Sequence, residues 1–444
     1  MPKKGDITKC ENYRTISLIN HGSKILLEIL RKRMKPYAES ILAEEQAGFR
    51  TGRSTVEQVS CLLIQHRLEK QNGKVFCVFI DYKKAFDRVW HVALFEVLHQ
   101  YGIPTKLINI IKDLYHKAKS CIRVDNEFTD WFLTTIGVRQ GCLLSPDLFN
   151  LFLENIMSEA FAECTDLGIN IDGCRLKDLR FADDIALLAD SEEDLQTLIS
   201  KVHEISKKYG MEISIPKTKT MVFDSNSEDP VKANIQIENT TLDQVDKFKY
   251  LGVTLTASND STTEIRCRLM QASIVLGKLQ RIWKDDDISL KTKLRLLNAL
   301  VYPVLLYGSE IWTIKKADRK KIEAFELRCY RKILNIKWQD KIKNEDVIAR
   351  ISRASFNPTK NITSRINEAQ LSWFGHVSRM KSHRNPNRIM LETVSGKNRI
   401  GRPRKRWEND ITKGLTFHSA YRTAQDRKLW SDQVHGANVP WTWQ

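Results

Sequence analysis

Aspartates at the ends of two distant apolar segments restrict the fold more than any other feature of this sequence. The first segment, "FIDYKKAFD" at 79–87, ends a β-branched and aromatic strand with Asp81. The second, "FADDIALLAD" at 181–190, places Asp183 and Asp184 side by side in an apolar run. Burying a carboxylate costs several kcal/mol unless the group is paired or bound to a metal. Aspartates so far apart in sequence meet only if their strands lie in one sheet.

Carboxylates at adjoining strand ends suit a hard divalent cation. Mg²⁺ takes oxygen ligands, commonly one or two carboxylates together with water and substrate phosphate. Two such ions about 4 Å apart stabilise both the attacking and the leaving oxygen of a phosphoryl transfer, and they also remove repulsion between neighbouring aspartates. The pattern predicts a site for two Mg²⁺ ions, with Mn²⁺ as an alternative. Taken alone, however, an Asp-Asp pair is more commonly part of a turn.

Positive charge is concentrated in the last third of the chain. The formal net charge is +17, and residues 301–444 hold 29 Lys or Arg against 13 Asp or Glu. Tryptophans are interleaved with this charge: Trp283, Trp312, Trp338, Trp373, Trp407, Trp430, Trp441 and Trp443. Basic and aromatic side chains together suit a phosphate backbone whose bases can stack. The alternative is a solvated basic surface over a small core that contains the tryptophans.

Several classes of protein are disfavoured. No apolar run reaches the roughly 18 residues of a membrane span, and "MPKKGDITKC" at the N-terminus holds no apolar signal-peptide core. The nine cysteines include no C-x-x-C pair, which indicates reduced thiols. No cysteine follows Cys329, so His376 and His383 are not expected to bind zinc. We therefore expect a protein of the nucleus and cytoplasm, without a membrane partner; the oligomeric state is not predicted.

Hydrophobic periodicity predicts a mixed α and β body followed by a mostly helical region. The expected helices cover 24–42, 91–102, 145–163, 191–210 and 261–283, and the expected strands cover 73–82, 178–190, 211–223 and 248–255. Ser145 is expected to cap the helix that follows it, with Pro146 at the first helical position. Ser261 and Glu264 have the spacing of a capping box.

The order of the motifs is far more specific than any one of them. The chain reads "PKKGD…NYRTISL", "QAGFRTGRST", "FIDYKKAFD", "GVRQGCLLSP", "FADD", "ISIPKTKTM" and "KYLGVTL". This order resembles that of reverse transcriptases of non-LTR retrotransposons, over roughly residues 2–256. In the tail, "WFGHVSRM" and "GRPRKRWEND" resemble the C-terminal region of RTE-type elements.

The resemblance implies a right-hand polymerase of the α+β class, with fingers, a palm containing an antiparallel sheet, a helical thumb and a basic C-terminal region. The expected parts are incomplete fingers at 1–75, a palm with interleaved fingers elements at 76–256, a thumb at 257–345, and a basic nucleic-acid-binding region at 346–444. Members of this family normally carry an endonuclease domain and further finger elements before "PKKGD". The resemblance therefore implies an N-terminally truncated chain without the endonuclease.

Four catalytic positions follow from matching the motifs residue by residue. Asp81 and Asp183 match the metal-binding aspartates, and Asp184 matches the neighbour of the second, which is less directly involved in the family. All three are expected as metal ligands. Lys217, in "PKTKTM", matches the lysine that protonates the leaving pyrophosphate, with Lys219 as the competing choice. A lysine can do this only if it is well placed and its pKa is lowered.

Five further positions match substrate contacts of the family. Phe86 matches the steric gate, whose bulk excludes a ribose 2′-OH, although a core Phe is the alternative. Gln140 and Gly141, in "RQG", match a template and nucleotide contact. Arg14 and Arg50 match basic positions of the fingers, and arginine suits a triphosphate because it binds phosphate bidentately.

Three segments keep more than one interpretation. Asp87 either joins the metal site or caps the helix that begins a few residues later. Tyr250, Leu251 and Gly252 resemble the primer grip, but such a triplet alone is ordinarily core. "GRPRKRW" at 401–407 is a minor-groove arm, a nuclear localisation signal or an exposed basic loop.

The most specific functional hypothesis is an RNA-directed DNA polymerase acting in retrotransposition. Its partners are an RNA template, a DNA primer or target, and deoxynucleoside triphosphates. A truncated, catalytically inactive relic that binds RNA or DNA is the second hypothesis, and an RNA-directed RNA polymerase is the third. Phe86 and the sequence "FADD", in place of "GDD", favour a DNA polymerase over an RNA polymerase.

Overall fold

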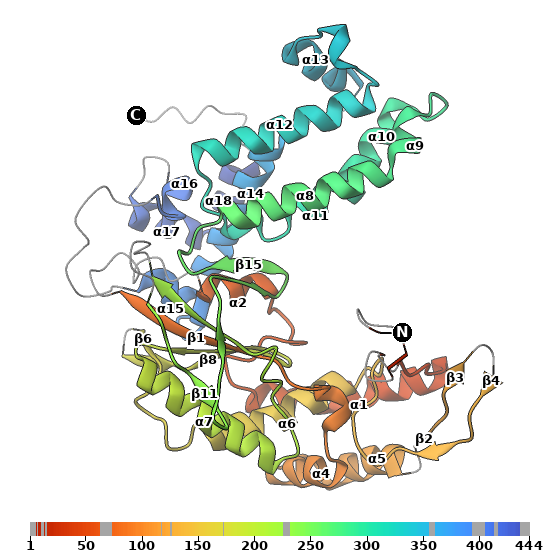
Figure 1. The fold of residues 1–444 in the computed structure, drawn as a ribbon, viewed down its shortest axis with the longest axis vertical. Helices are drawn as coiled ribbons and strands as arrows, with labels where there is room; N and C mark the ends of the chain where they lie inside the picture. Colours follow the sequence, from red (N-terminus) through yellow and green to blue (C-terminus); the bar gives the residue numbers. More distant parts are fainter. Residues whose placement is uncertain are drawn as a thin grey trace. The chain divides into compact units, whose positions relative to one another are not determined.

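The protein is described from a computed structural model. The described residues are 6, 8–9, 13, 16–62, 73–116, 118–124, 127–171, 173–224, 231–354, 360–392, 405–412 and 416–435. They divide between two compact units (Figure 1). Unit 1 contains 1–58, 74–222 and 229–245, and unit 2 contains 59–73, 223–228 and 246–444, each within the described ranges.

A five-stranded sheet forms the centre of unit 1, in the order β13-β10-β1-β9-β8. Its strands are β1 (Lys74–Ile80), β8 (Asp178–Phe181), β9 (Asp184–Ala189), β10 (Lys219–Asp224) and β13 (Asp243–Gln244). Strand β9 pairs antiparallel with both β1 and β8, while β10 and β13 are parallel. Nearly every side chain of β1 and β9 is buried, which explains why both strands are continuous apolar runs.

Helices cover this sheet (Figure 1). Helix α7 (Glu192–Lys208) packs on β1 and β9, and α6 (Ser145–Ala160) packs against α7, α4 (His91–Gln100) and α1 (His21–Ile41). Helix α6 is buried on most of its surface because it lies between other helices. The remaining elements are α2 (Thr55–Leu62), η2 (Ala85–Arg88), α5 (Thr105–His116), β2 (Lys119–Ser120), β3 (Arg123–Val124), β4 (Glu127–Phe128), β5 (Phe132–Leu133), β6 (Ile169–Ile171), β7 (Cys174–Leu176), β11 (Gln236–Ile237) and β12 (Thr240–Thr241).

Unit 2 begins with a hairpin of β14 (Lys247–Tyr250) and β15 (Val253–Thr256) and is otherwise helical. Its helices are α8 (Thr262–Lys278), α9 (Gln280–Lys284), α10 (Leu290–Leu296), η3 (Leu297–Val301), α11 (Tyr302–Leu306), η4 (Ser309–Ile311), α12 (Lys316–Ile333), η5 (Trp338–Asp340), α13 (Asn344–Ala354), α14 (Ile362–Ser378), α15 (Asn385–Leu391), α16 (Glu408–Thr412), α17 (Phe417–Gln425) and α18 (Arg427–His435). One core joins α8, α12, α13 and α14, and a second gathers around Phe374 and Trp430.

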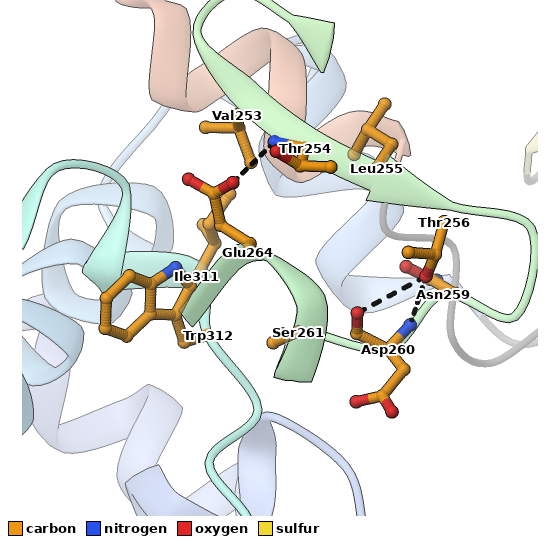
Figure 2. A pocket seen from close by; sticks show the side chains of 10 residues that line it. All are labelled: Val253, Thr254, Leu255, Thr256, Asn259, Asp260, Ser261, Glu264, Ile311 and Trp312. Carbon is orange, nitrogen blue, oxygen red and sulfur yellow. Dashed lines mark hydrogen bonds between the residues drawn. The ribbon is translucent and has the colours of Figure 1, made fainter. Parts of the chain in front are cut away.

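The hairpin of unit 2 is joined to the start of α8 by polar contacts (Figure 2). The N–H of Thr254 donates to the Glu264 carboxylate at 2.7 Å, and the N–H of Asp260 donates to Thr256 Oγ1 at 3.0 Å. These residues line a small cavity of about 20 Å³, which has room for roughly one water molecule. The recess is therefore part of the packing between hairpin and helix rather than a substrate pocket.

Two predicted helix caps are wrong. Ser145 is the first residue of α6 and does not cap it; its hydroxyl pairs with that of Tyr115 at 3.3 Å. Ser261 stands at the cap of α8, but its hydroxyl accepts from the N–H of Thr313 at 3.0 Å, so no capping box forms with Glu264. Both hydroxyls have tertiary partners, which compete with local capping.

Two segments predicted as single strands are hairpins. Residues 178–190 form β8 and β9 with Ala182 and Asp183 in the turn, and residues 248–255 fall in β14 and β15 with Leu251 and Gly252 in the turn. Residues 211–218 contain a bridge and a turn, and the strand begins only at Lys219. The predicted α+β class and the helices at 24–42, 91–102 and 191–210 are confirmed, each within a few residues.

Two other findings concern the whole described chain. The eight cysteines within the described ranges are free thiols. Among those same residues, no helix combines the length and the apolar character that crossing a membrane requires. The predicted four-part division stays a prediction. Val347, Ile351, Ile362 and Ile366 share one core with α8 and α12, so hydrophobic packing continues across residue 345.

Candidate active site

Asp81, Asp183 and Asp184 come together at one edge of the sheet in unit 1. Ile80 of β1 lies opposite Ile185 of β9, so the next pair in this antiparallel register is Asp81 and Asp184. Asp183 precedes β9 in the turn from β8. Partial desolvation, followed by the nearby charges of Asp183 and Asp81, raises the pKa of Asp184 to about 6. The predicted meeting of the two aspartate segments is therefore observed.

This carboxylate group fits a divalent cation. Asp81 Oδ1 is buried and accepts no hydrogen bond, although 44% of the side chain is exposed. A cation would satisfy that oxygen and relieve the repulsion from Asp183 and Asp81, which adds to desolvation in raising the pKa of Asp184. Among the residues that the structure describes, no three His, Cys, Asp or Glu side chains form a ready metal-binding cluster. Mg²⁺ commonly takes only one or two carboxylates and completes its shell with water and substrate phosphate, which this arrangement permits.

Lys217 and Lys219 have different surroundings. Lys217 Nζ lies 3.6 Å from Asp81 Oδ1, and its side chain is 69% exposed. Lys219 Nζ instead pairs with Asp243 at 2.7 Å and donates to the carbonyl of Pro216. Of the two predicted alternatives, Lys217 is therefore the one that lies beside the carboxylates; its catalytic role stays a prediction.

A neighbouring segment holds the turn that carries Asp183. Ala182 adopts φ +57°, which is uncommon for a residue other than glycine. The buried Gln46 accepts, at its Oε1, the N–H groups of Ala182 and Gly48, each at 2.9 Å. A Cβ added at Gly48 would lie 2.3 Å from the Ala182 nitrogen, so only glycine fits there. The sequence motif "QAGFR" predicts a role for Arg50 but not for Gln46, whose hydrogen-bond donor Ala182 lies far away in the sequence.

A buried arginine supports the same hairpin. Arg180 of β8 pairs with Asp178 at 2.6 Å and with Glu154 of α6 at 3.2 Å. The N–H of Ala47 donates to the Arg180 carbonyl at 2.8 Å, which places the "QAG" segment along the edge of β8. Burial raises the pKa of Asp178 to about 7 despite the opposing charge of Arg180. A signal for this network was present in the sequence, since an arginine within a buried strand needs acidic partners.

Phe86 and Asp87 lie in η2, beyond the end of β1, and each has a side-chain partner from another segment. The Phe86 ring stacks on Phe149 of α6, with centroids 4.4 Å apart and planes 14° apart. Gln140 Nε2 donates to Asp87 Oδ1 at 3.0 Å. The residue before α4 is Trp90, and it makes no side-chain cap, so Asp87 does not cap that helix. One face of Phe86 is thus core-packed, and its role as a steric gate stays a prediction.

Gly141 and Arg50 are fixed by backbone contacts. Gly141 has φ +94°, and an added Cβ would lie 3.2 Å from the carbonyl oxygen of Ser17, so this position favours glycine. Arg50 pairs with Glu39 at 3.0 Å and donates to the carbonyl of Gln46 at 3.0 Å. These contacts hold the loop after α1, and a triphosphate role for Arg50 stays a prediction. Arg14 lies outside the described residues.

The predicted primer-grip residues form a closed turn in unit 2. Leu251 and Gly252 have φ values of +46° and +84°. The Tyr307 hydroxyl donates to the Leu251 carbonyl at 2.8 Å, and Arg268 donates to the Gly252 carbonyl. The Arg268 guanidinium also lies 4.6 Å from the centre of the Tyr307 ring. Tyr250 itself is buried. The contact with a primer stays a prediction.

Three of the six described tryptophans that are interleaved with the positive charge are structural. Trp283, Trp312 and Trp430 are between 0% and 4% exposed and lie in the two cores of unit 2, so for them the core alternative is correct. Of the segment "GRPRKRW", residues 401–404 lie outside the described ranges. Lys405 Nζ donates to the carbonyl of Ile314 at 2.6 Å, and Trp407 Nε1 donates to the carbonyl of Glu310 at 2.8 Å. The end of that segment is therefore anchored to unit 2.

Comparison with known proteins agrees with the motif order. Residues 1–255 match the family described as reverse transcriptase (RNA-dependent DNA polymerase). The chain is 30% identical over 341 residues to a probable RNA-directed DNA polymerase from transposon BS of Drosophila melanogaster, a match that covers 73% of this chain and 36% of the relative. It is 25% identical over 341 residues to the corresponding protein of the X-element of Drosophila melanogaster, with 74% and 36% covered.

The chain thus spans about a third of the length of these relatives. A solved structure, apo telomerase from Candida tropicalis, is 13% identical, with a TM-score of 0.43, and the likeness covers 83% of this chain and 62% of that one. The curated relatives are polymerases of transposable elements, as the motif order predicted. Because the family match covers more than half of its residues, the chain belongs to the reverse transcriptase (RNA-dependent DNA polymerase) family.

Proposed function

We propose that this chain is an RNA-directed DNA polymerase that extends the 3′ end of a DNA primer on an RNA template during retrotransposition. The supporting observation is the meeting of Asp81 with Asp183 and Asp184 at adjoining ends of β1 and β9. Asp81 and Asp183 would hold Mg²⁺, with Asp184 beside them. Two bound Mg²⁺ ions would supply the positive charge that stabilises the attacking and leaving oxygens.

The other residues bind, orient and move protons. Lys217, whose Nζ lies beside Asp81, gives a proton to the leaving pyrophosphate. Phe86 closes the pocket against a ribose 2′-OH. Gln140 and Gly141 hold the incoming base pair through close backbone approach. Arg50 binds triphosphate, for which its guanidinium must exchange Glu39 for phosphate.

Two further contacts belong to the proposal. Arg14 joins Arg50 in binding the triphosphate, and Tyr250, Leu251 and Gly252 pack against the primer end. The proposed substrates are an RNA template, a DNA primer or target, and deoxynucleoside triphosphates.

Primer extension by the purified chain tests the proposal. The wild type should extend a DNA primer on an RNA template in the presence of Mg²⁺, and Asp183→Asn should abolish extension, since losing one carboxylate costs several kcal/mol of transition-state stabilisation. Asp190→Asn, at the opposite end of β9, is the matched control and should remain active. A wild-type chain that binds primer and template but never extends with Mg²⁺ or Mn²⁺ is instead a binding relic.

A further inference from the structure

Trp338 differs from the core tryptophans of unit 2. Its side chain is 83% exposed, whereas Trp283, Trp312 and Trp430 are almost fully buried. A tryptophan left in water forgoes the large burial energy of its indole ring. An isolated exposed indole therefore calls for an explanation from its surroundings.

The loop that carries Trp338 has a defined shape. Trp338 begins η5, a single turn of 3₁₀ helix between α12 and α13. Asn335 before it and Lys341 after it have φ values of +54° and +50°. The N–H of Lys337 donates to Asp340 Oδ2 at 2.8 Å and closes the turn. These contacts determine where the indole projects.

Core contacts anchor the loop on both sides of the indole. Ile336 and Ile342 pack against the main core of unit 2. Arg331 of α12 donates to the Ile342 carbonyl at 3.2 Å and to Asn344 Oδ1 at 2.7 Å. Trp338 thus stays outside because an anchored loop holds it there. Figure 1 shows α12 leading into α13 through this connection.

Exposed lysines lie close to Trp338 in the sequence. Lys337, Lys341 and Lys343 are all exposed within five residues of Trp338. Three acidic residues lie nearby as well: Asp340, whose carboxylate accepts the backbone N–H of Lys337, and Glu345 and Asp346 in the first turn of α13. An exposed indole in a loop with three exposed lysines matches an unpaired nucleotide, which offers a base to stack and phosphates to neutralise. A hydrophobic protein surface would leave three lysines to desolvate.

We propose that Trp338, Lys337, Lys341 and Lys343 form a binding site for single-stranded nucleic acid. The indole stacks on an unpaired base, and the three ammonium groups contact the adjoining phosphates. Whether the bound strand is the template or the primer depends on the proposed polymerase function. The binding of single-stranded nucleic acid does not depend on it.

Fluorescence anisotropy with a labelled single-stranded RNA of about 16 nucleotides tests the site. Trp338→Ala in the full chain should weaken binding roughly 5- to 100-fold, the cost of one stacked base. The dependence of affinity on salt should stay unchanged, because stacking releases no counterions. Trp338→Phe should keep most of the affinity. The triple variant Lys337→Ala, Lys341→Ala, Lys343→Ala should lower the salt slope by about 2.

Trp131→Ala is the matched control, since Trp131 is also exposed but lies in unit 1 beside Asp130. Equal affinity of wild type and Trp338→Ala, or equal losses in Trp338→Ala and Trp131→Ala, would overturn the site. The site would also be overturned if Trp338→Ala lost the same affinity for a duplex as for single-stranded RNA. Cross-linking of wild type to RNA that contains 4-thiouracil is independent of any variant and should label the tryptic peptide 338–341; absence of that label also contradicts the site.

Primer extension with the same preparations separates the two proposals. If the wild type extends primers while Trp338→Ala binds RNA normally, the binding site is wrong and the polymerase function stands. If no preparation extends a primer but Trp338→Ala still loses RNA affinity, the site stands and the polymerase function fails.

Discussion

The side-chain oxygen of Gln46 accepts the backbone N–H of Ala182 at 2.9 Å, across 136 positions of sequence. Ala182 is the residue before Asp183, so this bond orients the turn that presents a proposed metal ligand. The same oxygen also accepts the N–H of Gly48, whose Cα faces the Ala182 backbone. The loop after α1 and the turn between β8 and β9 therefore support each other's backbone conformation.

Replacing Gln46 should impair catalysis more than substrate binding. Gln46→Leu leaves two buried N–H groups without an acceptor, each costing about 1–3 kcal/mol, and releases the turn. A displacement of about 1 Å at a reacting group can lower the rate roughly 100-fold, so we expect kcat to fall by that order while KM changes little. Steady-state primer extension measures both constants.

Two other variants check this interpretation. Gly48→Ala should produce the same loss of kcat, because its Cβ would displace the Ala182 nitrogen. Gln58→Leu removes a buried glutamine that donates to the Glu45 carbonyl, and it should lower stability with kcat retained. If Gln46→Leu lowers only the unfolding temperature, Gln46 is a packing residue.

Lys217 and Lys219 should behave differently on substitution. Lys217→Met should lower kcat about 100-fold or more, because a general acid is lost. Lys219→Met should leave kcat unchanged, since that ammonium pairs with Asp243 instead. Steady-state rates of primer extension by the two variants measure the difference. Loss of activity in Lys219→Met alone would reverse the assignment.

Phe86→Val should allow incorporation of ribonucleotides. The substitution opens space at the proposed 2′ position, and the lost stack on Phe149 costs about 0.5–1.5 kcal/mol of stability. The measurement is the ratio of ribo- to deoxynucleotide incorporation efficiency. Phe149→Val is the control, because it breaks the same stack from the buried side and should leave the ratio unchanged. A fixed ratio in Phe86→Val, with both rates lowered, assigns Phe86 to packing.

The carboxylate group should make stability depend on pH and on metal. Partial desolvation and neighbouring charge raise the pKa of Asp184 from 3.8 to about 6, so the folded state binds this proton more tightly than the unfolded state. The contribution of protonated Asp184 to the free energy of unfolding is fully present below about pH 4 and is lost as the pH rises through about 6. Without metal, Asp184→Asn should therefore raise the unfolding temperature at pH 7.5 and leave it unchanged near pH 4.

Mg²⁺ should stabilise the wild type more than Asp184→Asn at pH 7.5, because the cation relieves the same repulsion. Asp147→Asn is the control: burial also raises the pKa of Asp147 to about 6, near Arg31 of α1. That variant should show a pH effect without losing the response to Mg²⁺. Equal Mg²⁺ responses in wild type and Asp184→Asn contradict a metal role for this group.

The position of the aspartates at adjoining strand ends was predictable because few folds can accommodate two such apolar segments. A buried β-branched run that ends in aspartate must lie in a sheet, and two of them with carboxylates must meet. Asp81 and Asp184 were predictable in this way. Helix α7 was equally predictable from the sequence, since Ser191 caps it and Gly210 follows its end.

Contacts between distant polar groups were not predictable in the same way. The residues around Ser145 and Ser261 have good capping chemistry, yet Tyr115 and Thr313 compete for their hydroxyls. Neither partner can be identified from local spacing. The support of Ala182 by Gln46 has the same origin, because hydrogen bonds between a side chain and a distant backbone group leave no periodic trace in the sequence.

The turn at Leu251 and Gly252 has a consequence for motion. Its two carbonyls are held by Tyr307 and Arg268, and Arg268 also pairs with Glu264 of α8. A loop tip ordinarily samples new backbone conformations within nanoseconds to microseconds. Here any flip of either peptide group breaks a contact to another element of unit 2. The tip of this turn is therefore expected to keep one backbone conformation within unit 2. A nucleic-acid strand that binds there would meet a surface that is already formed before binding.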